Sequence, residues 1–202
     1  TSVNNQIFGS AQCPGDKSIS QRVLMMGALM NQEMKVDGFL HGEDPLSTMN
    51  ALNQIGAGIT VDESGLIYLH KRKQIFDNCE QALHFGNSGT GLRLMLGLTS
   101  GMGLNLSFCG DASLSSRPMS RVINPLIEMG ADIKSSNGKL PISLSPASFQ
   151  KRYTYELPVA SAQVKSSILL AGLASGIGIK SIEPIQTRDH TERMVKNFGA
   201  NL

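Results

Sequence analysis

A chain of 202 residues can bury the core of one large domain or of two small ones. Its composition, 41% hydrophobic and 17% charged, is that of an ordinary globular protein, and a net charge of +2 is too small to indicate a nucleic-acid partner. The apolar runs are too short to span a bilayer, and residues 1–9 lack the basic and apolar regions of a signal peptide. We therefore expect a cytoplasmic protein with no nucleic-acid or membrane partner. The three cysteines are far apart and show no metal-ligand spacing, so neither a metal nor another cofactor is expected.

The first part of the chain predicts a strand, a buried helix, a second strand, a second helix and a strand pair. Residues 1–13 are expected to form a strand that belongs to a second domain. Residues 18–29 have a polar start and an almost wholly apolar body, which is typical of a buried helix. A strand is expected at 36–40, and a helix with one apolar face is expected to end at a glycine cap, Gly56. The closing strands are predicted at 59–61 and 66–69, around a Ser64-Gly65 turn.

The same order of elements recurs twice further along the chain. The second copy is predicted to have helices at 90–98 and before Gly130, and strands at 104–109, 133–135 and 142–144. The third copy is predicted to have a helix at 163–173, a strand at 180–182 and a helix that ends at Gly199. The three capping glycines lie 74 and 69 residues apart, so each copy is a structural unit of the type β-α-β-α-β-β.

This repeat predicts the fold class and the domain organisation. We expect residues 14–202 to form one α/β domain of three units, at about 14–76, 77–150 and 151–202. The three apolar helices are expected to form a buried parallel bundle, with the sheets and the outer helices around it. The third unit stops after its glycine cap and lacks a closing strand pair, which indicates a piece of a larger protein.

The starts of the three apolar helices carry the candidate chemistry. They are rich in glycine and small polar residues, and the first also has Lys17 with Arg22 one turn later. Free N–H groups and the helix dipole make such ends favourable sites for phosphate or carboxylate. In a parallel bundle the three ends would meet, which predicts a ligand with more than one anionic group. The alternative is plain helix capping by Ser18, Thr90 and Ser161.

Other candidate motifs are weaker. The stretch before Lys17 has no glycine at the spacing of a phosphate-binding P-loop, so nucleoside triphosphate binding is not expected. Arg117 precedes a proline at the start of an outer helix, on the same edge as the helix ends described above. His190 is expected to be a polar or capping residue, and Asp44 and Asp111 are expected to cap helices. Arg121, Arg193 and Lys196 are expected to be outer-face charges.

Five blocks of this sequence, in order, resemble the 5-enolpyruvylshikimate-3-phosphate synthase family, in particular its bacterial class II. They are PGDKSISQR at 14–22, GNSGTGLR at 86–93, GDASLSSRPM at 110–119, SAQVKS at 161–166 and TRDHTE at 187–192. The resemblance covers nearly the whole chain. It implies a fold of two inside-out domains, and transfer of the enolpyruvyl group of phosphoenolpyruvate to the 5-hydroxyl of shikimate 3-phosphate. This reaction belongs to the shikimate pathway, which leads to chorismate and the aromatic amino acids.

The resemblance also implies roles for individual residues. The residues expected to bind shikimate 3-phosphate are Lys17, Ser18, Arg22, Ser161, Ala162, Gln163 and Arg188. Those expected to bind phosphoenolpyruvate are Lys17, Asn87, Gly89, Thr90, Arg117 and Gln163. Lys17 would contact both substrates and take part in catalysis. A side chain at Gly89 would crowd the phosphoenolpyruvate pocket, so the herbicide glyphosate should fit if the site forms.

In the family, the acidic pair and several cations lie in the second domain, so this chain is expected to bind shikimate 3-phosphate weakly and not to turn over alone. The sequence departs from the family pattern at Gln21, where a histidine is usual, and little functional consequence is expected. The UDP-N-acetylglucosamine enolpyruvyl transferases are an alternative, but their reactive cysteine aligns with Ala112, three residues after Cys109. A non-catalytic binding or assembly domain is the other alternative.

Overall fold

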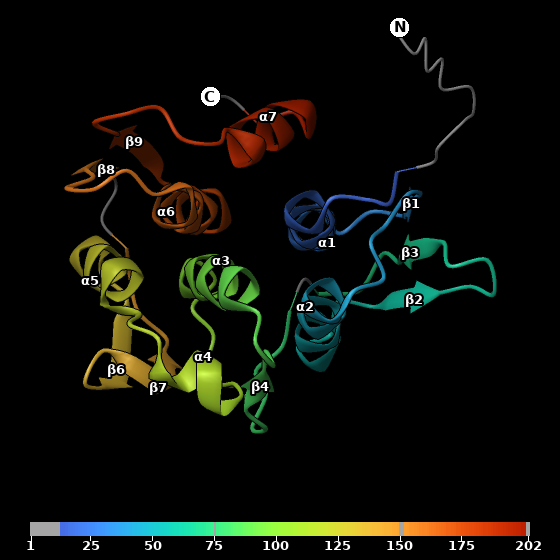
Figure 1. The fold of residues 1–202 in the computed structure, drawn as a ribbon, viewed down its shortest axis with the longest axis horizontal. Helices are drawn as coiled ribbons and strands as arrows, with labels where there is room; N and C mark the ends of the chain where they lie inside the picture. Colours follow the sequence, from blue (N-terminus) through green and yellow to red (C-terminus); the bar gives the residue numbers. More distant parts are fainter. Residues whose placement is uncertain (1–12, 75, 150–151, 201–202) are drawn as a thin grey trace, which may run out of the picture.

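The computed structural model describes residues 13–74, 76–149 and 152–200, and the strand predicted at 1–13 lies almost entirely outside these ranges. Within them, Figure 1 shows helices viewed end-on at the centre of the molecule, with strands at its edges. The predicted α/β fold class and its inside-out arrangement are confirmed. No helix in the described ranges is long and apolar enough to cross a membrane.

Three apolar helices form the centre of the bundle, as the repeat predicts. They are α1 (Lys17–Met30), α3 (Gly89–Ser100) and α6 (Ala162–Ser175), each two or three residues longer than predicted. Glycines let them approach closely: a Cβ atom added at Gly97 in α3 would lie 2.1 Å from the main-chain oxygen of Ser167 in α6. The same helices carry much of the core, because their side chains are buried on most of their circumference.

The outer helices end in one shared motif. They are α2 (Glu43–Gln54), α5 (Ser120–Met129) and α7 (His190–Asn197). Gly56, Gly130 and Gly199 follow them with φ of 87°, 116° and 85°, a backbone conformation that favours glycine. After α2, the N–H of Gly56 donates to the oxygen of Asn53 and the next N–H donates to Leu52, and the other two helices repeat this pair. The motif is a Schellman cap, and the predicted glycine stops are confirmed.

The first sheet corrects one prediction. Its strands β1 (Met34–Val36), β2 (Ile59–Val61) and β3 (Ile67–Leu69) are antiparallel in the order β1-β3-β2. The strand predicted at 36–40 is wrong, because the strand ends at Val36. Gly38 has a φ of 68°, and the N–H of Leu40 donates to the Ser20 hydroxyl, so the chain turns back onto α1 there.

The remaining strands form two sheets. One sheet has the order β4-β5-β7-β6, with β4 (Leu83–His84), β5 (Leu106–Cys109), β6 (Asp132–Ser136) and β7 (Lys139–Ser145). The other pairs β8 (Arg152–Glu156) with β9 (Gly178–Ile182) in parallel. A short helix that the sequence did not predict, α4 (Ala112–Ser116), follows β5. The predicted Asn137-Gly138 turn joins β6 to β7, with both residues at positive φ.

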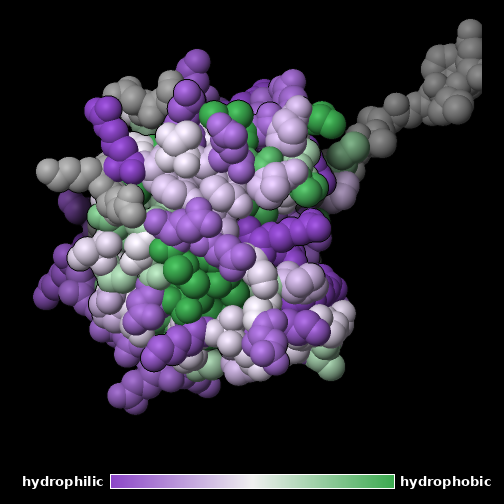
Figure 2. Space-filling view, turned by 90° about the vertical axis from the view of Figure 1, so that its left-hand side faces the viewer, coloured by the Kyte–Doolittle hydropathy of each residue, from purple (hydrophilic) through white to green (hydrophobic). Residues whose placement is uncertain are grey.

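The apolar core is continuous from the first sheet to α6, and its largest fully buried side chains include Phe85 and Phe108. Figure 2 shows the face that lies on the left in Figure 1. This face is mostly hydrophilic, with a compact apolar area near its centre and smaller apolar groups toward its upper edge. The charged groups that matter for the site lie elsewhere, at the end of the bundle where α1, α3 and α6 begin.

Candidate anion-binding site

Two adjoining cavities lie at the N-terminal ends of the central helices. The larger measures about 490 Å³ and is lined by Lys17, Asp44, Asn87, Gly89, Thr90, Arg93, Arg117 and Gln163. The smaller measures about 50 Å³ and is lined by Ser18, Arg22, Thr90, Ala162, Gln163, Arg188 and His190. Thr90 and Gln163 belong to both linings, so the cavities share a wall. The structure therefore brings together every predicted site residue except Ser161.

The residues that cap the three central helices are not the residues that line the two cavities. Asp16 caps α1 by accepting from the N–H of Ile19 at 2.8 Å, and Ser88 caps α3 by accepting from the N–H of Gly91 at 3.2 Å. Ser161 caps α6, as the capping alternative predicted. That alternative is wrong for Ser18 and Thr90, because they lie inside the first turn and line the cavities.

The larger cavity has an ion pair at its edge. Lys17 Nζ lies 2.8 Å from Asp44 Oδ2, with the lysine side chain about half exposed. Asp44 was predicted to cap a helix, which is wrong: Gly42 is the N-cap of α2 and Asp44 lies in its first turn. Asp111 does cap α4, through the N–H of Leu114. The ion pair keeps Lys17 at the cavity without an anion present, and a bound anion would compete with Asp44 for it.

Two further arginines face the larger cavity. Arg93, which was not among the predicted site residues, donates from Nη1 to Gln163 Oε1 at 3.0 Å. Arg117 donates from Nη2 to Asn87 Oδ1 and to Ser113 Oγ. Burial lowers the pKa of Arg93, and the nearby Arg117 charge lowers it further. Like charges held this close make the cavity strongly favourable for an anion.

Gln163 divides the two cavities. Its Nε2 donates to Thr90 Oγ1 at 2.9 Å while its Oε1 accepts from Arg93, so both ends of the amide are held. The Gln163 amide therefore spans from α6 to α3. This contact fixes the relative position of the two helix N-termini.

Arg22 lies at the base of the smaller cavity and is 4% exposed. It donates to the Thr191 hydroxyl at 2.7 Å, to the Ser166 hydroxyl at 2.9 Å and to the main-chain oxygen of Ser18 at 2.9 Å. Burial lowers the pKa of Arg22 to about 10, and the charge of Arg188 contributes in the same direction. The guanidinium is thus a buried, fixed cation beneath the cavity.

Gln21 is a buried link between α1, α2 and the cap of α3. Its place inside α1 is as expected, but the side chain is fully buried. Nε2 lies within hydrogen-bond distance of the main-chain oxygen of Asp44, of Thr48 Oγ1 and of Ser88 Oγ. These atoms lie in α2 and at the cap of α3. Gln21 therefore joins three of the elements that surround the larger cavity.

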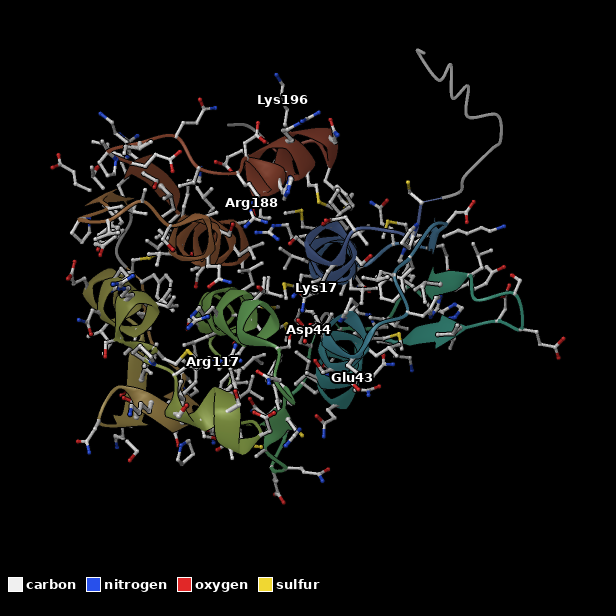
Figure 3. The ribbon with its side chains drawn as sticks, viewed as in Figure 1. Lys17, Glu43, Asp44, Arg117, Arg188 and Lys196 are labelled. Atoms are coloured by element: carbon white, nitrogen blue, oxygen red, sulfur yellow. The ribbon has the colours of Figure 1, made fainter. Side chains whose placement is uncertain are left out.

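Figure 3 shows the cations around the end of the bundle. Lys17 and Asp44 lie between α1 and α2, Arg117 lies below α3, and Arg188 lies between α6, α7 and α1. Lys196 points away from them at the outer side of α7, in agreement with its prediction as an outer-face charge. Among the described residues, His, Cys, Asp and Glu form no group of three or more that could hold a metal.

Fold and site together define a three-unit inside-out α/β domain whose helix N-termini and fixed cations converge on one end. The model of the EPSP synthase (3-phosphoshikimate 1-carboxyvinyltransferase) family matches residues 2–202, and the chain belongs to this family. The resemblance seen in the five sequence blocks is thereby confirmed.

Solved and curated relatives agree. The 3-phosphoshikimate 1-carboxyvinyltransferase of Vesicomyosocius okutanii is 46% identical over 98% of this chain and 46% of its own length. That of Novosphingobium aromaticivorans is 48% identical over 99% of this chain and 46% of its own length. An EPSP synthase structure from Acinetobacter baumannii superposes with a TM-score of 0.88 at 42% identity, covering 96% of this chain and 44% of the other. The chain thus spans about half the length of these relatives.

Proposed function

We propose that this chain supplies one half of the active site for transfer of the enolpyruvyl group from phosphoenolpyruvate to the 5-hydroxyl of shikimate 3-phosphate. The observation that carries the proposal is the convergence of the predicted residues on two adjoining cavities. Each substrate has a phosphate and a carboxylate. Helix N-termini, Lys17 and four arginines provide complementary partners at one end of the bundle. The family membership supplies the chemistry.

The two cavities suit the two substrates. In this assignment the smaller cavity, with Ser18, Arg22 and Arg188, binds the phosphate group of shikimate 3-phosphate together with the start of α6. The larger cavity, with Gly89 and Arg117, binds phosphoenolpyruvate. Lys17 lies at the edge of the larger cavity and is assigned contact with both substrates. The described site has Asp44 beside Lys17 but lacks the paired acids expected of the second domain, so turnover is assigned to the complete protein.

The domain organisation and location follow from the same assignment. Residues 1–13 are assigned to the second domain and 14–202 to the three-unit domain, with units at about 14–76, 77–150 and 151–202. A substrate-binding half of this kind needs the second domain as its partner and is assigned to the cytoplasm.

The UDP-N-acetylglucosamine enolpyruvyl transferase alternative is disfavoured by the position of its cysteine. Cys109 lies in β5 rather than in the segment before Arg117, and burial raises the pKa of its thiol. A thiol with a raised pKa is a poor nucleophile. The aligned position, Ala112, begins the short helix α4 and carries no reactive group.

A titration tests the proposal directly. Shikimate 3-phosphate is added to the 15N-labelled chain while amide shifts are followed by NMR, with unphosphorylated shikimate as the control ligand. We expect shifts to concentrate at the starts of α1, α3 and α6. Lys17→Met should weaken binding by about ten- to a hundredfold, because one hydrogen bond to a charged group is lost. Shifts spread over other faces, or equal binding of shikimate, would disprove the anion site.

A turnover assay separates the enzyme half from a non-catalytic domain. Phosphate release is measured with phosphoenolpyruvate and shikimate 3-phosphate, first with the chain alone and then with a purified second domain of a close relative. We expect release only in the combined sample. Absence of release from a combined sample that forms a complex would favour the non-catalytic alternative.

A further inference from the structure

A buried cluster of charges joins α6 to the segment that leads into α7. The side chain of Lys165 is 6% exposed, and its Nζ lies 2.8 Å from Glu183 Oε1 and 2.6 Å from Glu192 Oε1. Lys165 is not among the described residues that line the two anion cavities. Its charge is therefore paired within the protein, with two glutamates that lie on either side of Arg188 in the sequence.

Hydroxyl groups extend this cluster. Thr187 donates to Glu183 Oε2 at 2.6 Å, next to the lysine contact. Thr191 is fully buried, accepts from Arg22 Nε at 2.7 Å and donates to the Ser166 hydroxyl at 2.7 Å. The segment from 183 to 192 is thus bound to α6 at both ends, through Glu183 and Glu192, and to α1 at its C-terminal end through Thr191.

Residues 183–189 of this segment belong to no helix or strand. β9 ends at Ile182 and α7 begins at His190, so the residues between them belong to neither element. Arg188 lies in this interval and is exposed, yet it lines the smaller cavity together with Arg22. The charge of Arg188 is close enough to lower the pKa of Arg22. Two like charges therefore lie near one small cavity. Like charges repel, so contacts elsewhere must keep Arg188 in place.

We propose that Lys165 is a positioning residue, whose ion pairs with Glu183 and Glu192 hold segment 183–192 so that Arg188 faces the smaller cavity. Lys165 touches no ligand itself and acts through Arg188. This inference rests on the proposed function, because it assigns Arg188 to the phosphorylated substrate. By this proposal, ligand binding at the starts of α1 and α6 depends on the cluster of Lys165, Glu183 and Glu192, which lies outside the cavity.

Removing the lysine charge should release the segment. In Lys165→Met, two partly buried carboxylates would face each other without their shared cation, so they would repel or take up protons. The segment can relieve this by moving outward, and Arg188 would move with it. Lys180→Met is the matched control, because Lys180 lies in the neighbouring strand β9 with an exposed side chain.

The ligand-free chain gives the first readout. Hydrogen exchange of amides 185–190 is compared between the original chain and the two lysine variants. We expect exchange to rise on the order of tenfold in Lys165→Met, with α2 and α3 unchanged, and no change in Lys180→Met. Thr187→Val is a milder variant for use if Lys165→Met fails to fold, and it should raise exchange in the same amides. Unchanged exchange in Lys165→Met, or in Thr187→Val where that variant replaces it, would overturn the proposal.

A double-mutant cycle gives the second readout. The dissociation constant of shikimate 3-phosphate is measured for Lys165→Met, Arg188→Gln and the double variant. We expect Lys165→Met to weaken binding roughly tenfold alone and by less than about twofold in the Arg188→Gln background. Equal loss in both backgrounds would show that Lys165 does not act through Arg188. If the original chain binds no shikimate 3-phosphate, the proposed function fails. The exchange experiment still tests whether Lys165 holds segment 183–192 in place.

Discussion

Replacing Gly97 by alanine tests the close approach of the bundle helices. The added Cβ atom would lie 2.1 Å from the main-chain oxygen of Ser167 and 2.5 Å from its hydroxyl oxygen. Carbon and oxygen need about 1 Å more than this, so α3 and α6 must separate. Overpacking of a core costs about 1–3 kcal/mol, and the obstructing atom here is backbone, which cannot rotate away. Alanine recovers about 1 kcal/mol of helix propensity over glycine. Because the backbone cannot yield, we take the upper end of the overpacking cost, about 3 kcal/mol, and expect a net loss of about 2 kcal/mol after the gain in helix propensity.

Thermal unfolding measures this loss. For a chain of this length, about 2 kcal/mol corresponds to a Tm lower by roughly 4–8 °C. Gly178→Ala is the control, because its Cβ would meet only Arg152 Cγ at 3.7 Å and should leave the Tm almost unchanged. Gly27→Ala should lie between the two, since its nearest obstacle is the flexible end of Met34. A Gly97→Ala Tm equal to that of the original chain would refute the close helix approach.

Two more predictions concern the cavity and acid pH. Gly89→Ala places a Cβ atom 2.9 Å from Arg93 Nη1 and 3.2 Å from Arg117 Nη1. The affinity for phosphoenolpyruvate, measured by calorimetry, should therefore fall at least tenfold, while the Tm stays nearly unchanged. Undiminished binding would show that Gly89 is not part of the site. Burial raises the pKa of Glu183, but hydrogen bonds and the charge of Lys165 outweigh it and hold the pKa below its usual 4.5. The folded pKa lies below the unfolded one, so this stabilisation is present above pH 4.5 and is lost as the pH falls through the folded value. The free energy of unfolding of Glu183→Gln, measured with urea, should therefore depend less on pH below 4.5 than that of the original chain. An equal pH dependence would contradict a stabilising role for the Lys165–Glu183 ion pair.

The parts of the fold that were predicted correctly are those that depend on local sequence patterns. The apolar helices were visible because the part of each helix that follows its polar start is almost wholly apolar, and such a helix is stable only when buried. Gly56, Gly130 and Gly199 marked helix ends because each has a positive φ that other residues adopt only with strain. The convergence of the helix starts followed from the repeat alone, because equivalent helices in equivalent units point the same way.

Contacts between distant side chains could not be predicted in the same way. Asp44 lies 27 residues from Lys17, and nothing local distinguishes an acid that caps its own helix from one that pairs with another element. Gln21 looked like an ordinary helix residue because its three partners come from elsewhere in the chain. The strand at 36–40 was misplaced because apolar residues stand on both sides of the turn at Gly38, Val36 before it and Phe39 and Leu40 after it.

The charges at the site explain why composition gave no sign of it. The chain has a net charge of only +2, yet the two cavities are lined by one lysine and four arginines. Asp44 and Glu192 offset part of this charge locally, one beside Lys17 and the other near Arg22. The remaining positive charge is held in place by helices, caps and buried ion pairs, and it is complementary to a phosphate and a carboxylate. Affinity should then depend on how rigidly those cations are held, which makes positioning groups such as Gln21 and Lys165 as consequential as the residues that touch the anion.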